Sequence, residues 1–219
     1  MKFNSLITEI VIFFFILLFL ILPPLFGEQV NVDLSLVFTW TFPLQQLLMA
    51  IFSLCILLFY HKSRKQKINI FGFRIFFTLG ILFCSYFLIS FLSMVIPNNS
   101  PVINPIPLPS TFVTWIFCIL NFMFGAFYEE VIYRFYFTDT LLDILNNINP
   151  LFDKKITKII CEIITALLFA SAHYYMGIFA VLNALIAHFA LRYTYKKSNS
   201  IIPGVIAHFL YNMISLILL

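Results

Sequence analysis

The chain has few charged side chains. Aspartate, glutamate, lysine and arginine together make up 10% of its 219 residues, whereas 62% of the residues are hydrophobic and 29 are phenylalanine. A water-soluble protein covers itself with polar and charged groups, and this supply is too small to cover a domain of this length. The composition therefore excludes a soluble globular protein and indicates an integral membrane protein.

Cysteine motifs are lacking as well. The four cysteines stand alone in apolar segments, with no CxxC or Cys/His ligand spacing, so we expect them to be small buried apolar residues. They are Cys55, Cys84, Cys118 and Cys161. The cations are too few and too scattered for a nucleic-acid surface, since the formal net charge is only +4. We expect no nucleic-acid partner.

Long apolar runs are the dominant pattern. Each approaches the length of about 20 residues that a helix needs to cross a bilayer. The first run ends in Pro23-Pro24 without a small-residue cleavage pattern, so we expect an anchor rather than a cleaved signal peptide. The sequence predicts an all-α, multi-pass transmembrane helical bundle of about seven spans. The runs are 6–25, 34–60, 75–96, 113–137, 159–175, 177–195 and 201–219.

The basic residues suggest the orientation of this bundle. Apart from Arg134, they lie near the N-terminus or in three predicted loops, and seven spans place these loops on the side of the N-terminus. The loop residues are Lys62, Arg64, Lys65, Lys67, Arg74, Lys154, Lys155, Lys158, Arg192, Lys196 and Lys197. Positive loops favour the cytoplasmic side, where the leaflet is anionic. We expect a protein of the cell (plasma) membrane with a cytoplasmic N-terminus.

No long linker, repeat or low-complexity tract divides the chain, so we expect one integrated membrane domain. Its two parts differ in what they carry. Residues 1–110 are predicted to form N-terminal transmembrane helices without a recognisable motif. All candidate catalytic residues lie in 111–219. The second part is the predicted catalytic core.

Three charged residues, Glu129, Glu130 and Arg134, lie close together within the mostly apolar stretch 111–145. Charges within a membrane segment are costly and usually face a protein interior or a water-filled cavity, so they favour a functional site. At helical spacing Glu130 reaches Arg134, whereas Glu129 points elsewhere. We expect Arg134 to neutralise Glu130 and to leave Glu129 available to deprotonate a water molecule. A purely structural contact between helices is the alternative.

Two later spans repeat a four-residue spacing of polar or aromatic groups. Phe169 precedes His173 by four residues, and His208 precedes Asn212 by the same interval. Residues four apart share one face of a helix, so each pair can present its members together. A lone intramembrane histidine is often a hydrogen-bonded core residue. Together with the acidic pair, these residues favour a shared site near mid-depth of the membrane.

These motifs, in this order on successive predicted helices, resemble the CPBP intramembrane protease family. That family includes the type II CAAX prenyl endopeptidases, bacteriocin-processing and self-immunity proteins, and Abi-type membrane proteins. The segment 198–208 also resembles the polar turn that leads into the last motif of the family. The resemblance covers about 111–216. It is carried by Glu129-Glu130-x-x-x-Arg134, Phe169-x-x-x-His173 and His208-x-x-x-Asn212.

The resemblance implies catalytic roles for four residues. Glu129 would be the base that activates water, with assistance from His173, and His208 and Asn212 would stabilise the oxyanion of the tetrahedral intermediate. Amide hydrolysis needs both a nucleophilic water and donors aimed at the developing negative charge. The four residue types therefore suit the chemistry that the family implies.

Three more motif residues would support the site. Glu130 and Arg134 would brace the helix and orient Glu129, and Phe169 would pack beside His173 and fix its rotamer. In the sixth span, Asn183 and His188 are expected to hydrogen-bond across helices.

The metal requirement stays open at the level of sequence. Glu129, His173 and His208 could supply one carboxylate and two imidazoles, a ligand set of catalytic zinc sites that keep water in the fourth position. A metal-free glutamate protease fits the same residues, and no HExxH motif is present. Zn²⁺ is thus one of two alternatives.

The sequence thus predicts an intramembrane endopeptidase, either glutamate-dependent or metal-dependent. Its expected partners are the lipid bilayer and a membrane-associated peptide or lipidated protein, including prenylated CAAX-type substrates. The alternative is a non-catalytic membrane immunity, partner or transport protein that uses the same polar network structurally. Transporters commonly show internal repeats, and none is visible here.

Overall fold

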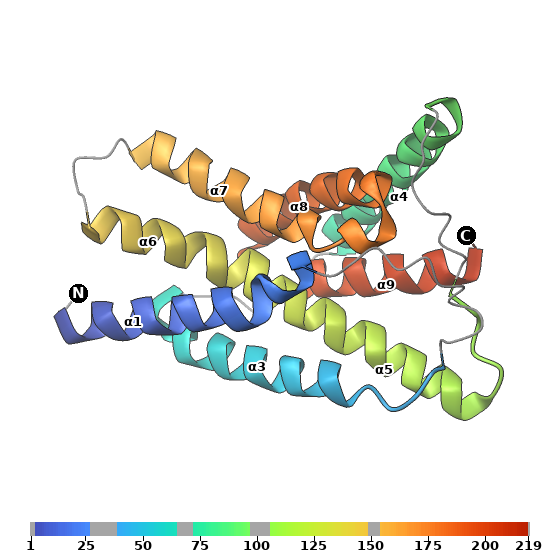
Figure 1. Cartoon of the computed structure of the whole chain (residues 1–219), viewed down its shortest axis with the longest axis horizontal. Coiled ribbons are helices and arrows are strands. Elements are labelled where there is room, and N and C mark those ends of the chain that lie inside the picture. The colour runs from blue at the N-terminus through green and yellow to red at the C-terminus, as the bar shows by residue number, and fades with distance from the viewer. Residues whose placement is uncertain (1–2, 27–38, 65–71, 97–105, 149–153, 219) are drawn as a thin grey trace.

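A computed structural model describes residues 3–26, 39–64, 72–96, 106–148 and 154–218 (Figure 1). All regular structure in these ranges is helical, which confirms the all-α class. The α-helices are α1 (Phe3–Ile16), α3 (Leu44–Arg64), α4 (Gly72–Val95), α5 (Phe112–Glu129), α6 (Thr138–Ile148), α7 (Lys154–Ser171), α8 (Ile178–Ser198) and α9 (Ile202–Leu218). Two π-helical segments are η1 (Leu17–Ile21) and η3 (Glu130–Phe137), and two 3₁₀ segments are η2 (Pro23–Phe26) and η4 (Tyr174–Met176).

Four helical segments are long and apolar enough to cross a membrane, and two shorter apolar helices accompany them. Together with α7 they correspond to the seven predicted spans. The start of the second predicted span lies outside the described residues. The four long segments are Leu6–Phe26, Gly72–Val95, Phe112–Ile148 and Ile178–Ser198, and the shorter ones are Leu44–Tyr60 and Ile202–Leu218.

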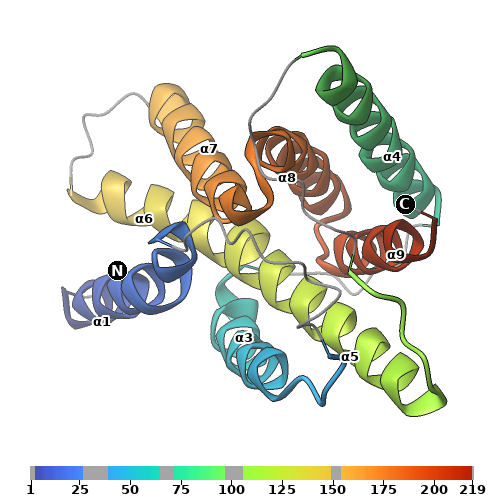
Figure 2. The ribbon, with the colours of Figure 1, turned by 45° about the vertical axis from the view of Figure 1, so that its right-hand side comes forward.

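One unbroken helical segment, formed by α5, η3 and α6, runs through the middle of the bundle. It extends from Phe112 to Ile148, 37 residues, and so continues well past the predicted boundary at 137. At 1.5 Å per residue it is about 55 Å long, nearly twice the apolar thickness of a bilayer. In Figure 2, α1 and α3 lie on one side of this central helix, and α7, α8 and α9 lie on the other. Most other helices therefore meet η3 or its immediate neighbours.

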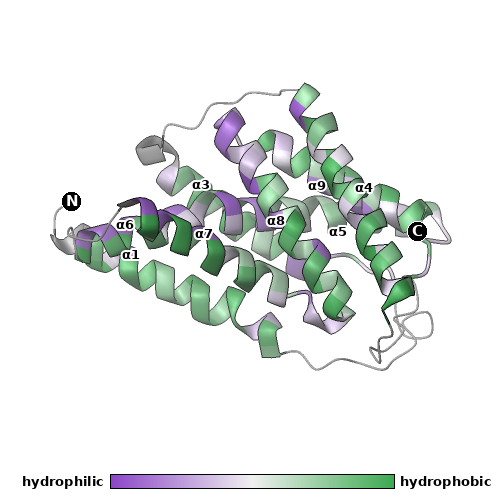
Figure 3. Ribbon diagram, turned by 90° about the horizontal axis from the view of Figure 1, so that it is seen from above, coloured by the Kyte–Doolittle hydropathy of each residue, from purple (hydrophilic) through white to green (hydrophobic). Residues whose placement is uncertain are grey.

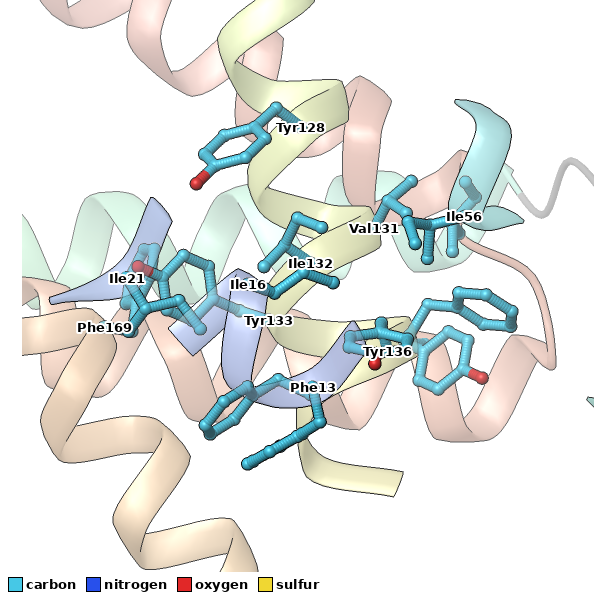
Figure 4. Close-up of a cluster of buried hydrophobic side chains, with 14 of the residues drawn as sticks. Phe13, Ile16, Ile21, Ile56, Tyr128, Val131, Ile132, Tyr133, Tyr136 and Phe169 are labelled. Atoms are coloured by element: carbon cyan, nitrogen blue, oxygen red, sulfur yellow. The ribbon is translucent and has the colours of Figure 1, made fainter. Parts of the chain in front are cut away.

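The N-terminal helix packs directly against η3. Phe13 of α1 stacks on Phe137 with ring centroids 4.7 Å apart. Ile16 and Ile21 have no exposed surface, and Figure 4 shows them beside Tyr133 of η3. Each such apolar side chain contributes about 1.5–3 kcal/mol in water by leaving solvent, and in lipid the same contacts act through close packing. Residues from 1–110 thus share one core with the segment that carries the acidic pair.

The outer face of the bundle is apolar. Figure 3 shows that most of the ribbon is hydrophobic, with polar residues in short stretches. Large side chains point outward, such as Phe73 and Phe112, which are 82% and 80% exposed. Cys55 and Cys84 also lie on the exposed surface, whereas Cys118 and Cys161 are buried as expected. Such a surface suits contact with lipid chains rather than with water.

The two ends of the chain lie at opposite ends of the bundle (Figure 1). We therefore expect reporter proteins fused to the N-terminus and to the C-terminus to lie on opposite sides of the membrane, with the N-terminal reporter in the cytoplasm. Protease protection of the two fusions in membrane vesicles measures this. Equal protection of both reporters would contradict an odd number of spans.

Candidate active site

The acidic pair lies where a regular α-helix gives way to a π-helix. Glu129 is the last residue of α5, and Glu130 is the first residue of η3. In the wider turns of a π-helix, groups five residues apart become neighbours. Accordingly, the Arg134 side chain approaches the carbonyl oxygen of Glu129, with Nη1 3.4 Å away, and Thr138 Oγ1 donates to the carbonyl oxygen of Tyr133. The regular α-helical spacing predicted from the sequence therefore does not hold for 130–137. Single π-helical turns occur frequently at functional sites.

Glu130 is the buried centre of the cluster. Its side chain is 1% exposed, and Oε1 lies 3.0 Å from Nδ1 of His208 and 3.5 Å from Nε of Arg134. A buried carboxylate is tolerated only when it is paired and hydrogen-bonded. The expected pair with Arg134 is therefore present, but His208 forms a second and shorter contact with Glu130.

Gly204 of α9 allows this close packing. A Cβ atom at position 204 would lie 2.8 Å from Oε2 of Glu130, closer than side chains normally approach. Because glycine lacks a Cβ, the carboxylate can lie against the α9 backbone one turn before His208.

Glu129 faces a different environment, as the helical spacing predicts. Its side chain is 27% exposed, so it is reachable from outside the bundle, and Oε2 lies 3.8 Å from Nε2 of His208. That oxygen is itself buried and has no hydrogen-bond partner among the described residues. Glu129 therefore has one carboxylate oxygen ready to accept a proton or a hydrogen bond.

The hydrogen bonds of the two histidines determine which ring nitrogens carry protons. Nδ1 of His173 lies 2.9 Å from the carbonyl oxygen of Phe169, which can only accept, so Nδ1 is the donor. In the neutral ring, Nε2 of His173 then keeps its lone pair. Nδ1 of His208 faces the Glu130 carboxylate and likewise donates when that carboxylate is ionised. Nε2 of His208 therefore remains directed toward Glu129.

Phe169 links the acidic segment to His173. The guanidinium carbon of Arg134 lies 3.9 Å from the centre of the Phe169 ring, a close cation–π contact. The same ring lies 4.8 Å from the His173 ring. His173 is not on α7, however, because that helix ends at Ser171 and His173 begins the following turn with φ −96° and ψ 6°. The predicted run 159–175 was thus too long at its end.

Asn212 follows His208 by one turn of α9 and is half-buried. Within the part of the chain that the structure describes, its amide has no hydrogen-bond partner. The structure thus brings Glu129, Glu130, Arg134 and His208 into direct contact. It joins His173 to this group through Phe169, and it leaves the Asn212 amide available.

The predicted zinc ligands do not form a ligand set. No group of three or more histidine, cysteine, aspartate or glutamate side chains among the described residues is arranged to hold a metal ion. Oε2 of Glu129 and Nε2 of His208 lie 3.8 Å apart, but His173 is linked to the acidic segment only through the Phe169 ring and does not complete a group of three. The arrangement of Glu129, His173 and His208 therefore does not fit a metal site.

A second buried ionic cluster, centred on Arg192, was not predicted from the sequence. Arg192 was expected in a cytoplasmic loop, but it lies inside α8, is 4% exposed, and forms ion pairs with Asp139 and Glu162. Its other arm donates to the carbonyl oxygen of Arg134. Lys196, one turn further along α8, also pairs with Asp139.

Two polar residues of α8 behave differently from each other. Asn183 bridges helices as expected, since it donates to the Tyr211 hydroxyl and accepts from Ser85 of α4. His188 is fully buried, yet neither ring nitrogen has a hydrogen-bond partner among the described residues. The expectation that His188 bonds across helices is therefore wrong, and its ring instead packs 5.6 Å from Phe169.

A bundle of membrane helices around a paired carboxylate and two oriented histidines defines a polytopic membrane protein with a buried acid–histidine site. Residues 111–214, nearly half of the chain, match the family model described as type II CAAX prenyl endopeptidase Rce1-like. This part of the chain is similar to that family, and the match confirms the resemblance drawn from the three motifs. The family supports a protease in general. The chain has no significant match among curated proteins, and none among solved structures.

Replacing Gly204 with alanine tests the close approach of Glu130. The added methyl group would push the carboxylate away from His208 and Arg134, so we expect Gly204→Ala to lower the free energy of unfolding by about 1–3 kcal/mol. Denaturation in mixed micelles measures the change. In the matched control Gly80→Ala, the new methyl group meets no atom within 4 Å, and stability should change by less than about 1 kcal/mol. Equal stability of both variants would contradict the packing.

Shortening Phe169 tests its contact with the buried guanidinium. Phe169→Leu removes the aromatic face beneath Arg134, and a desolvated cation–π contact is worth about 2 kcal/mol. We expect at least that loss of unfolding free energy, measured in the same way. Phe189→Leu is the control, because Phe189 is 46% exposed and should cost well under 1 kcal/mol, about the effect of an ordinary surface change. A loss that is no larger for Phe169→Leu would refute the contact.

Proposed function

We propose that the chain is an intramembrane endopeptidase that hydrolyses a peptide bond of a membrane-associated or prenylated CAAX-type peptide. The observation that carries the proposal is the contrast between the two histidines. The carbonyl oxygen of Phe169 holds His173 through Nδ1 and leaves a lone pair on Nε2, whereas the buried carboxylate of Glu130 holds His208 through Nδ1 and leaves Nε2 beside Glu129. One ring can thus accept a hydrogen bond from a water, and the other lies next to the proposed base, where amide hydrolysis needs an oriented polar group.

In the proposed reaction Glu129 is the general base. Oε2 of Glu129 has no hydrogen-bond partner among the described residues and accepts a proton from a bound water. The water oxygen forms a bond to the scissile carbonyl carbon, and the carbonyl electrons move onto its oxygen. Nε2 of His173 accepts a hydrogen bond from the same water and orients it. When the intermediate collapses, the C–N bond breaks and the leaving nitrogen takes the proton from Glu129.

His208 and Asn212 would stabilise the oxyanion. When His208 carries protons on both nitrogens, Nδ1 donates to Glu130 and Nε2 presents a donor beside Glu129. In that state the two glutamates are balanced by Arg134 and the imidazolium, so the cluster carries no net charge. Such preorganised donors in a site shielded from water commonly contribute about 10²–10³-fold to the rate.

The surroundings of His173 support a membrane-linked substrate. Tyr174, Tyr175 and Met176 follow it directly in η4 and are 48%, 49% and 36% exposed. They form an apolar surface next to the site, against which the lipid group or apolar side chains of a substrate can lie. A peptide tethered to the bilayer would therefore meet Glu129 from the membrane side.

Replacing Glu129 with glutamine tests the proposed base. Glutamine keeps the shape of the side chain but cannot accept the proton, so we expect kcat to fall by about 10²–10⁴-fold with little change in KM. The assay uses purified protein in liposomes with farnesylated CAAX peptides, the same peptides without the lipid, and unrelated apolar peptides. Asp143→Asn, the same kind of change on an exposed position of α6, is the control and should cleave like the wild type.

Two outcomes of that assay decide between the alternatives. Full activity of Glu129→Gln would refute the role of Glu129. Cleavage of the unmodified peptides as fast as the farnesylated ones would refute the CAAX-type substrate while leaving the peptidase. Repeating the assay with a metal chelator tests metal dependence separately, because a metal-free glutamate-dependent enzyme should keep its activity in the chelator.

A further inference from the structure

Arg192 is a buried cation outside the three motifs. It lies on α8 and is only 4% exposed. A single guanidinium here contacts three other helical segments: Asp139 on α6, Glu162 on α7 and the backbone of Arg134 in η3. One side chain thus joins four helical segments, its own included.

The planar fork of arginine makes this geometry possible. Nε donates to both carboxylate oxygens of Glu162, at 3.1 and 2.9 Å, and Nη2 lies 2.9 Å from one of them. Nη2 also donates to Asp139, while Nη1 is left to donate to the Arg134 carbonyl. Lysine, with one ammonium group on a flexible stem, cannot reproduce such a set of fixed directions.

A buried ion pair of this kind is weak evidence for stability. The cost of removing two or three charges from water often exceeds their attraction, and apolar side chains in the same place are frequently as stable. A better-supported role of a buried ion pair is to fix one arrangement of the packed helices.

The hydrogen bond from Arg192 to the backbone of Arg134 indicates which arrangement the cluster fixes. Arg134 is the residue whose side chain reaches Glu130 Oε1 and the carbonyl oxygen of Glu129, and it stacks on Phe169. Arg192 holds the backbone of that same residue within the π-helical segment. A shift of this backbone would move both glutamates relative to His208.

We propose that Arg192 is a positioning residue for the acidic pair: it holds the π-helical turn in register with α7 and α8, so that Glu129 and Glu130 meet His208. Its kinetic consequence rests on the proposed function, whereas its structural consequence, the placement of Glu130 against His208, does not. Arg192 touches no reacting atom in this scheme.

The diagnostic variant is Arg192→Lys, which keeps the positive charge for the carboxylates of Asp139 and Glu162 but loses the separate arm to Arg134. We expect folded protein in which kcat is about 10–100-fold lower and KM changes less than about twofold, since small displacements of catalytic groups cost rates of this order. Lys196→Gln is the matched control. It removes the other cation on Asp139 without touching η3, and kcat should remain that of the wild type.

A second measurement does not depend on cleavage. In protein labelled with ¹⁵N-histidine, the Nδ1 signal of His208 reports its hydrogen bond to Glu130, and its absence from the His208→Gln spectrum assigns it. We expect this signal to shift in Arg192→Lys and to stay in place in Lys196→Gln. An unchanged signal in folded Arg192→Lys would overturn the proposal, whether or not any peptide is cleaved. If Glu129→Gln cleaves normally while the signal does shift, the peptidase mechanism fails and the positioning role stands.

Discussion

The structure depends on providing polar partners for a carboxyl group in the interior of a membrane bundle. Glu130 is almost completely buried, and water contributes little to its solvation. Arg134 and His208 replace that water, the first from the same helix and the second from α9. Because a lost partner would leave a buried charge at a cost of several kcal/mol, the positions of η3 and α9 are tied to each other. The closeness of the two helices in turn requires a residue without a side chain at Gly204.

The aromatic side chains extend this constraint to α7. Phe169 contributes no functional group to hydrolysis, yet its ring contacts Arg134, Tyr133, His173 and His188. A guanidinium that lacks enough hydrogen-bond acceptors gains from an aromatic face, and the contact also limits the rotamers of the neighbouring imidazole. One phenylalanine thereby couples the charge balance of the acidic segment to the placement of a histidine on another element.

Sequence reasoning recovers the parts of this arrangement that follow from composition and short-range spacing. The helical class follows from apolar runs that can satisfy their backbone only as helices in lipid. The Glu130–Arg134 pair follows from four-residue spacing. The contact between His208 and Glu130 could not be inferred, because it joins residues 78 apart through tertiary packing. The Arg192 cluster was missed for a related reason, since a basic residue near the end of an apolar run has the same local pattern whether it is exposed or buried.

The π-helical segment has one more consequence. A π-turn has more residues per turn than the α-helix on either side. It therefore rotates the side chains that follow it about the helix axis, relative to the positions they would have in a continuous α-helix. The face that α5 presents to α3 and α9 and the face that α6 presents to α1 and α7 are therefore out of step with a single helical repeat. The 37-residue helix meets two sets of neighbours with two independent apolar patterns, and the change of phase occurs at Glu130–Phe137, beside Glu129.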